Sequence, residues 1–257
     1  MKILCLGDVV GEEGTNLLAR GRRLWKLRES LRADLVIVNG ENSAPGNGIT
    51  PASARALLDA GADVITGGNH TWRRREITSM LDDEEILLRP ANYPASAAGH
   101  GWCIADAAGW RVLVINLAGC VYMESLESPF TAADRILREC AGKYDAAVVD
   151  IHAEATSEKM ALARYLDGRV SAVVGTHTHV ATADARIFPG GTGYITDLGM
   201  CGSHAGILGV STDAILHKFL VKTPVQFTPA TGEIEGHGVL LEISGGRCTA
   251  IEAVSFS

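Results

Sequence analysis

The sequence predicts an α/β protein in which two stacked, mixed β-sheets are flanked by helices. The first part of the 257 residues alternates strand-like apolar runs with helix-like segments, which is typical of a parallel sheet covered on both faces. After His179, strand-like runs and tight turns dominate, which favours antiparallel pairing. No linker, repeat or low-complexity segment divides the chain, so we expect one domain over residues 1–257.

The elements of the first part have local causes. Short apolar runs indicate buried strands, and an amphipathic pattern with leucines on one side indicates a helix. Thr50-Pro51 is a good helix start, because it combines a capping hydroxyl with proline at the first helical position, and Gly61 is a good stop. We expect strands at 2–7, 35–39 and 63–66, and helices at 15–32, 51–60 and 73–81.

Glycine pairs and apolar runs predict the remaining elements. A hairpin should turn at 107–109, and further tight turns are expected at Gly190-Gly191 and Gly245-Gly246. The expected strands are 102–105, 111–117, 146–151, 171–175, 185–188, 193–196, 224–228, 236–243 and 247–254, and the expected helices are 131–141, 156–167 and 212–221.

Composition excludes several classes of function. The net charge of -7 argues against stable binding of a nucleic-acid duplex or an anionic membrane surface. Aromatic residues make up only 5%, too few for the stacking stripe of an RNA-binding module. No apolar run reaches the roughly 18 residues of a membrane helix, and the N-terminal run is too short for a signal peptide. Six cysteines without CxxC spacing fit reduced thiols, so we expect a cytoplasmic protein.

Five short apolar runs each end in a residue that can bind a metal or move a proton. A strand packed in a core has no packing reason to finish on a carboxylate, an amide or an imidazole. The carboxyl ends of neighbouring strands share one edge of a sheet, so we expect these groups to meet in one crevice. In chain order they are Asp8, Glu41, Asn42, Asn69, His70, His152, His177 and His179.

All of these residues except His70 are candidate metal ligands. Asp8 and Glu41 offer anionic oxygens, and the asparagines and histidines add neutral oxygens and nitrogens without any cysteine. Such mixed donors suit manganese, iron or zinc. Seven donors exceed what one tetrahedral ion can use, so the sequence favours two divalent ions that share a bridging carboxylate.

A centre of this kind suits hydrolysis of a phosphate ester. Two divalent ions leave a net positive charge after Asp8 and Glu41 are counted, and this charge can hold an attacking hydroxide and a phosphoryl oxygen. His70 directly follows Asn69, so the two are poorly placed to bind the same ion. We therefore interpret His70 as the general acid that protonates the leaving oxygen.

The local backbone around the ligands also suggests roles. In an extended segment, His177 and His179 would point to the same side and could bind one ion or reach two. Glycines just before the ligands would let the backbone turn sharply at the strand ends. These glycines are Gly7, Gly40, Gly67, Gly68 and Gly175.

Each candidate has a simpler explanation when it is taken alone. Aspartate and asparagine commonly form turns and caps, and a lone histidine often belongs to a core. His204 lies in a glycine-rich loop, and could either line the cleft or be structural. Arg73–Arg75 could reach a substrate phosphate, although a solvated helix end is the default. Arg20 is interpreted as part of the solvated face of its amphipathic helix. The recurrence at five successive strand ends is what favours the metal centre.

Several motifs together resemble the YmdB-like branch of the calcineurin-like metallophosphoesterases. The resemblance covers essentially the whole chain in order, although Cys-Gly-Ser-His after Met200 replaces an expected Thr-Gly-Pro. The matching segments are GDVVG at 7–11, NGEN at 39–42, GGNHTW at 67–72, DIHAE at 150–154, GTHTHV at 175–180, TDLGM at 196–200 and GILG at 206–209.

The resemblance implies a fold, a reaction and a set of roles. The fold would be the calcineurin-like sandwich of two mixed sheets, and the reaction would be phosphodiester hydrolysis, with 2′,3′-cyclic nucleotides as substrates. Iron or manganese would be the usual metals. Asp8, Asn42 and His179 would hold one ion, and Asn69, His152 and His177 the other. Glu41 would bridge the ions, where many relatives use aspartate, and His70 would be the proton donor.

Two other functions remain open at this point. A phosphomonoesterase would use the same chemistry on the same scaffold. A regulatory protein that binds metal and nucleotide without turnover would need the same ligands but no general acid. The expected partner is a small phosphodiester substrate, and a homo-oligomer stays open.

Overall fold

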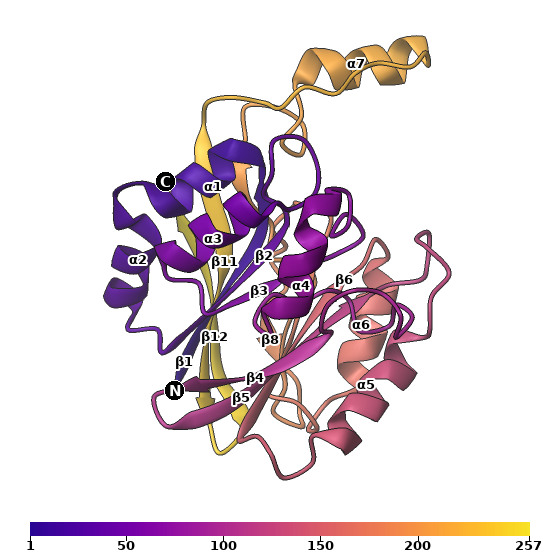
Figure 1. Cartoon of the computed structure of the whole chain (residues 1–257). Helices are drawn as coiled ribbons and strands as arrows, with labels where there is room; N and C mark the ends of the chain where they lie inside the picture. Colours follow the sequence, from indigo (N-terminus) through magenta and orange to yellow (C-terminus); the bar gives the residue numbers. More distant parts are fainter.

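The computed structural model describes residues 1–257 and contains two six-stranded sheets that lie face to face, with helices on their outer faces (Figure 1). This arrangement confirms the predicted fold class. The shared interior consists of apolar side chains from both sheets. Ile37 and Val239 enter it from the first sheet, and Val114 and Val174 enter it from the second.

The first sheet combines parallel and antiparallel strands in the order β12-β11-β10-β1-β2-β3. Strands β10, β1, β2 and β3 run parallel, so their carboxyl ends share one edge. Strand β11 pairs antiparallel with β1, β10 and β12. The bounds are β1 (Lys2–Val10), β2 (Leu35–Asn42), β3 (Val64–Thr66), β10 (Met200–Ser203), β11 (Ile234–Ser244) and β12 (Arg247–Phe256).

The second sheet has the order β4-β5-β6-β7-β9-β8. Its four central strands are parallel, and the peripheral strands β4 and β8 pair antiparallel at the two edges. The bounds are β4 (Trp102–Ala107), β5 (Trp110–Ala118), β6 (Ala146–His152), β7 (Ala172–Thr176), β8 (Arg186–Ile187) and β9 (Gly193–Ile195).

Helices cover the outer face of each sheet because each presents an apolar side to it. Leu17 and Leu57 belong to the core under the first sheet, and Ile136 and Leu162 to the core under the second. The first group comprises α1 (Gly11–Ala19), α2 (Arg23–Leu31), α3 (Pro51–Ala60) and α4 (Thr78–Asp83), and the second comprises α5 (Pro129–Glu139) and α6 (Thr156–Tyr165). None of the helices combines the length and hydrophobicity needed to cross a membrane.

Three of the predicted elements were wrong in part or in full, and one strand was missed. The helix expected at 15–32 is broken into α1 and α2 by a 3-10 turn at Arg20–Arg22, where Gly21 has φ 64°. Residues 73–81 are helical only from a 3-10 turn at Arg75–Ile77 onward. The expected strand at 224–228 does not form, because no neighbouring strand pairs with it, while β10 forms where a loop was expected.

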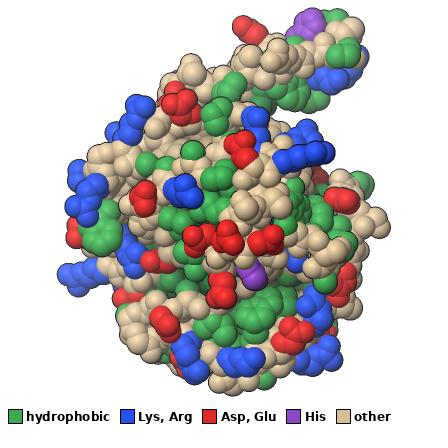
Figure 2. Space-filling view, viewed as in Figure 1, with side chains coloured by type: hydrophobic (Ala, Val, Ile, Leu, Met, Phe, Trp, Pro, Cys, Tyr) green, Lys and Arg blue, Asp and Glu red, His purple; other side chains and the backbone are tan.

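One helix stands apart from both sheets. Helix α7 (Thr212–Val221) lies at the end of a long excursion between β10 and β11, and projects from the body in Figure 1. Phe219 and Leu220 on this helix are 64% and 79% exposed. Figure 2 shows hydrophobic side chains on this projecting arm. The excursion matters for function because its base borders the cavity described below.

Candidate metal centre

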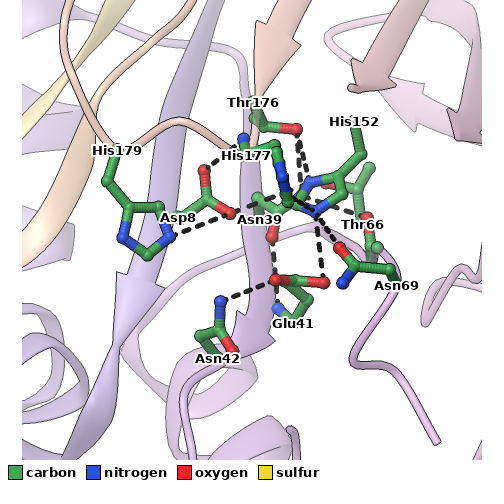
Figure 3. Close-up of polar contacts among 12 residues, drawn as sticks. Asp8, Asn39, Glu41, Asn42, Thr66, Asn69, His152, Thr176, His177 and His179 are labelled. Carbon is green, nitrogen blue, oxygen red and sulfur yellow. Dashed lines mark hydrogen bonds and ion pairs between the residues drawn. The ribbon is translucent and has the colours of Figure 1, made fainter. Parts of the chain in front are cut away.

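The structure brings all eight predicted site residues to one edge, where the parallel strands of both sheets end, and Figure 3 labels seven of them, all except His70. Strands β1 and β2 supply the carboxylates and one amide, and the segment after β3 supplies Asn69 and His70. His152 is the last residue of β6, and His177 and His179 follow β7. The two sheets therefore each contribute part of the cluster, whereas the strand-end pattern alone placed all of these groups at one edge of a single sheet.

His152 is the centre of one half of the cluster. Its Nε2 atom lies 3.0 Å from Asn69 Oδ1, 3.1 Å from His177 Nδ1 and 3.2 Å from Glu41 Oε2. The side chain of His152 is fully buried. Three further donor atoms thus surround His152 Nε2, a grouping that suits a cation bound by all four residues.

Asp8 and His179 lie in the other half. Asp8 Oδ1 is 3.7 Å from His179 Nε2 and 3.8 Å from His152 Nδ1. Asp8 Oδ2 accepts a hydrogen bond of 3.0 Å from the backbone N–H of His177. Asp8 Oδ1 and Asn42 Oδ1 are buried and have no hydrogen-bond partner. Buried acceptors without a donor are costly unless a cation or another donor satisfies them.

Glu41 lies between the two halves (Figure 3). Its Oε1 accepts a hydrogen bond of 2.6 Å from Asn42 Nδ2, while its Oε2 faces His152. The ligand atoms of Asp8, Glu41 and His152 all lie within 4.8 Å of one another. His70 also meets this carboxylate, because its N–H donates to Oε2 over 2.9 Å and its Nδ1 lies 3.0 Å from Oε1.

In the metal-free protein, burial and the close spacing of charged groups shift the pKa values of several residues in the cluster. Burial opposes charge on His152, but the carboxylates of Glu41 and Asp8 outweigh it and raise the pKa of His152 to about 9. Burial raises the pKa of Asp8 to about 6, against the pull of His179 and His152. Burial together with nearby His152 lowers the pKa of His177 to about 4. In the metal-free protein, a protonated His152 therefore offsets the negative charge of the neighbouring carboxylates, chiefly that of Glu41.

A buried network fixes the ring of His152. Its Nδ1 lies 3.0 Å from Thr176 Oγ1, which donates a hydrogen bond of 2.7 Å to Asp150. Asp150 also accepts from Thr66 Oγ1 and Asn39 Nδ2. Because the hydroxyl of Thr176 donates to Asp150, its oxygen can accept a hydrogen bond from the N–H at His152 Nδ1, which leaves Nε2 free as a ligand. We did not predict this network, although Asp150 stands two residues before His152.

The loop that carries His177 and His179 is not extended, so the prediction that both imidazoles point to one side was wrong. The two residues have φ values of 102° and 64°, a left-handed backbone that costs of order 1–3 kcal/mol for a residue with a side chain. The turn sends His177 toward His152 and His179 toward Asp8. Each half of the cluster thereby receives one imidazole from the same loop.

The five glycines that precede the candidate ligands do not serve the sharp turns that we predicted. None of the five expected glycines has a positive φ, so none is required for a sharp turn. Gly68 instead permits close approach, because a Cβ at that position would overlap Glu41 Oε2 and His152 Nε2. Gly175 similarly leaves no room for a Cβ, which would overlap the carbonyl oxygen of Thr196.

A cavity of about 810 Å³ opens over the cluster. Its volume falls in the range of roughly 300–1,000 Å³ that is typical of small-molecule sites. Arg20, which we expected to be a solvated helix residue, lines this cavity. The cavity lining also includes Glu41, Asn42, His70, His177, His179, Ser203, residues 208–210 and residues 227–231.

Two other predicted neighbours of the site lie elsewhere. His204 does not line the cavity, although the preceding Ser203 does. None of Arg73–Arg75 lines it either. The guanidinium of Arg74 donates to the carbonyl oxygens of Pro45 and Asn47, so this arginine supports a cavity-lining loop rather than a substrate phosphate.

Comparison with known proteins gives a consistent result. Residues 4–254 match the model of a family described as YmdB-like protein. The chain is 46% identical over 252 residues to a 2′,3′-cyclic-nucleotide 2′-phosphodiesterase of Bacillus subtilis, covering 98% of this chain and 95% of that protein. It is 35% identical to a putative phosphatase/phosphodiesterase of Mycoplasma pneumoniae, covering 95% of this chain and 88% of the relative.

Solved structures show the same similarity. A hypothetical protein from Thermus thermophilus superposes with a TM-score of 0.94 and 43% identity, covering 100% of this chain and 99% of that one. A novel phosphatase from Mycoplasma pneumoniae superposes with a TM-score of 0.92 and 32% identity, covering 100% of this chain and 93% of that one.

Proposed function

Because this chain belongs to the YmdB-like family, we propose that it is a metal-dependent phosphodiesterase that hydrolyses 2′,3′-cyclic nucleotides. The reaction class rests on the family and on the relative from Bacillus subtilis, whose name states this activity. The observation that carries the proposal here is the convergence of buried acceptors and imidazoles under the cavity. A solvated cyclic nucleotide is small enough to enter a cavity of about 810 Å³.

We propose seven residues as ligands of two divalent ions, with iron or manganese first and zinc as a further option. Asp8, Asn42 and His179 would hold one ion, Asn69, His152 and His177 would hold the other, and Glu41 would bridge them. The unpartnered Oδ1 atoms of Asp8 and Asn42 support the first group, and the short contacts of His152 support the second. Bound ions would neutralise charge on the phosphate and lower the pKa of a coordinated water.

The contacts of His70 fit the role of general acid. Nδ1 faces Glu41 at 3.0 Å, so the ring is held by one nitrogen and the other is free to meet a substrate in the cavity. Glu41 thereby positions His70 as well as serving as a ligand. In this assignment, Nε2 of His70 donates its proton to the alkoxide that leaves phosphorus.

A substrate panel tests the function. The protein, loaded with Mn²⁺ or Fe²⁺, is assayed with 2′,3′-cyclic AMP and with adenosine monophosphates, and phosphate products are followed by chromatography. We expect hydrolysis of the cyclic diester to exceed hydrolysis of every monoester. Preference for a monoester would identify a phosphomonoesterase instead, and loaded protein that hydrolyses neither would favour the non-catalytic regulatory function.

Substitution of His70 tests the acid separately from the metals. His70→Ala should keep its metal content but lower kcat on the cyclic diester by roughly 10²–10⁴. His100→Ala is the matched control, because this histidine is exposed and does not line the cavity. Wild-type turnover by His70→Ala would refute the acid role and leave the metal centre standing, whereas an Asp8→Ala variant with unchanged metal content would refute the centre.

We further propose a single domain over residues 1–257 and a cytoplasmic location. The shared core between the two sheets supports a single domain, because separation of the sheets would expose the apolar face of each to water. Six free cysteines support the second, because five of them are buried and none is paired. The proposed partner is a small phosphodiester, without stable binding of duplex nucleic acid or membrane. Sedimentation velocity tests whether the chain forms a homo-oligomer.

A further inference from the structure

A second group of metal-binding side chains lies outside the catalytic cluster. His204, Glu235 and His237 each offer one ligand atom, and these three atoms all lie within 4.8 Å of one another. The rings of the two histidines are 5.0 Å apart between centroids, and His237 Nε2 lies 3.5 Å from Glu235 Oε2. None of the three residues lines the catalytic cavity.

Backbone pairing holds the three residues together. Glu235 and His237 are two apart on β11, so their side chains leave the same face of the sheet. His204 directly follows β10, whose Ser203 pairs with Ile234. The N–H of His204 donates to the carbonyl oxygen of Glu233 over 2.9 Å, which anchors the loop beside β11.

An unsatisfied atom points to a missing partner in this group. The Nε2 atom of His204 is buried and has no hydrogen-bond partner. Glu235 is about half exposed, with its side chain 52% accessible, so the group also opens to solvent.

We propose that His204, Glu235 and His237 bind one divalent transition-metal ion, with Zn²⁺ the best match and a water molecule as its fourth ligand. Two imidazoles and one carboxylate form a known type of zinc site, with bonds of about 2.0–2.2 Å. Tetrahedral bonds of that length place donor atoms roughly 3.3 Å apart. The ligand atoms lie within 4.8 Å of one another, so side-chain rotation on binding would have to bring the more distant atoms together to this spacing.

The position of the site gives it a structural role. His204 begins the excursion that carries α7, and Glu235 lies just after its return. The same excursion supplies residues 208–210 and 227–231 to the cavity wall. An ion at this position would join the two ends of the excursion and so hold that wall in place. The site is independent of the proposed phosphodiesterase activity.

Metal titration of the metal-free, full-length protein tests the proposal. Zn²⁺ bound per chain is measured by elemental analysis after gel filtration, and Co²⁺ is used as a spectroscopic probe of four-coordinate geometry. We expect His204→Ala and His237→Ala each to bind one ion fewer than wild type and to lose the corresponding visible absorption of Co²⁺. Glu233→Gln is the matched control, because it removes a neighbouring carboxylate that is not a proposed ligand.

Glu235→Gln keeps the test decisive if a histidine variant fails to fold, because this side chain is half exposed. It should weaken binding of the additional ion at least tenfold while the ions of the catalytic cluster stay as in wild type. The proposal is overturned if wild type binds no more Zn²⁺ than the His204→Ala and Glu235→Gln variants, or if their Co²⁺ spectra are the same.

Discussion

The ammonium of Lys159 lies 2.8 Å from Asp197 Oδ2, and both side chains are fully buried. Lys159 also donates to the carbonyl oxygen of Thr176 over 2.7 Å. Asp197 accepts from the backbone N–H of Thr178 over 3.0 Å and from the N–H of Gly199 over 2.9 Å. The pair thus ties α6 to the strained loop that carries His177 and His179 and to the approach to β10.

Lys159→Met should destabilise the protein and weaken metal binding. The substitution leaves Asp197 as a buried carboxylate without its partner, which typically costs about 3–5 kcal/mol. Urea unfolding of metal-free protein measures this loss. Arg169→Met is the control, since it breaks an exposed pair with Asp134 and should cost about 1 kcal/mol or less. Equal losses in the two variants would contradict the role of the buried pair.

Gly68→Ala should lose metal rather than stability. The added Cβ would overlap Glu41 Oε2 and His152 Nε2, so at least one ligand must move. We expect metal content and kcat to fall by about tenfold or more, in line with the effect of displaced ligands. Gly109→Ala is the contrasting variant, because it meets no atom within 4 Å but has φ +82°. That change should cost about 1 kcal/mol of stability and leave metal content intact.

Thr176→Val should weaken metal binding by about 10–100-fold, the usual effect of removing a group that orients a ligand. The hydroxyl of Thr176 joins His152 Nδ1 to Asp150, and valine keeps the shape without this link. Thr176→Ser restores a hydroxyl and should recover most of the affinity. Calorimetric titration with Mn²⁺ gives the constants, and failure of serine to rescue would argue that packing, not the hydrogen bond, matters.

The metal-free protein should lose stability between pH 6.5 and 9. The folded pKa of His152 is raised to about 9 from an ordinary value of 6.5, so its proton stabilises the fold fully below pH 6.5. This contribution is lost as pH rises through 9 and amounts to about 3 kcal/mol for such a shift. Unfolding free energies across this range measure it, and His152→Gln should show a flatter profile.

Metal affinity should rise over the same pH range. Binding at His152 requires the neutral ring, so the ion that binds there displaces the proton that the metal-free protein holds on His152. Deprotonation of Asp8, whose pKa is about 6, adds to the effect at the acid end. Titration of Mn²⁺ in buffers of different ionisation enthalpy gives the number of protons released. Affinity that does not change with pH would contradict this coupling.

The sequence predicted the strands and their polar ends well because both depend on local pattern and simple topology. Apolar runs at 146–151 and 171–175 became β6 and β7 with ends within one residue of expectation. Parallel strands of one sheet end at a common edge, which explains why Asp8 lies near Glu41 in the first sheet and His152 near His177 in the second; stacking of the two sheets then joins the groups. The hairpin at 107–109 was also predicted from local pattern, and β4 and β5 pair around it.

The misses came from tertiary contacts and backbone angles that local pattern does not encode. The helix pattern at 15–32 continues through Gly21, but the backbone leaves the helical region there, with Arg20 extended at ψ 135° and Gly21 and Arg22 left-handed at φ 64° and 57°. The run at 224–228 has strand-like residues but no partner strand, and Phe227 lines the cavity instead. Lys159 looks like an ordinary helix lysine, because its burial depends on Asp197, 38 residues away.

The cluster takes its side chains from both halves of the sandwich, with Asp8 and Glu41 on one sheet and His152 on the other. Its geometry therefore depends on how the two sheets sit against each other. Truncation of Ile37 or Val114 in the shared core would let one sheet slide slightly against the other. Such a slide would separate donor atoms on different sheets, such as those of Glu41 and His152, that lie about 3 Å apart. Mutations in the apolar interior far from any substrate should thus appear first as altered metal content, well before the protein unfolds.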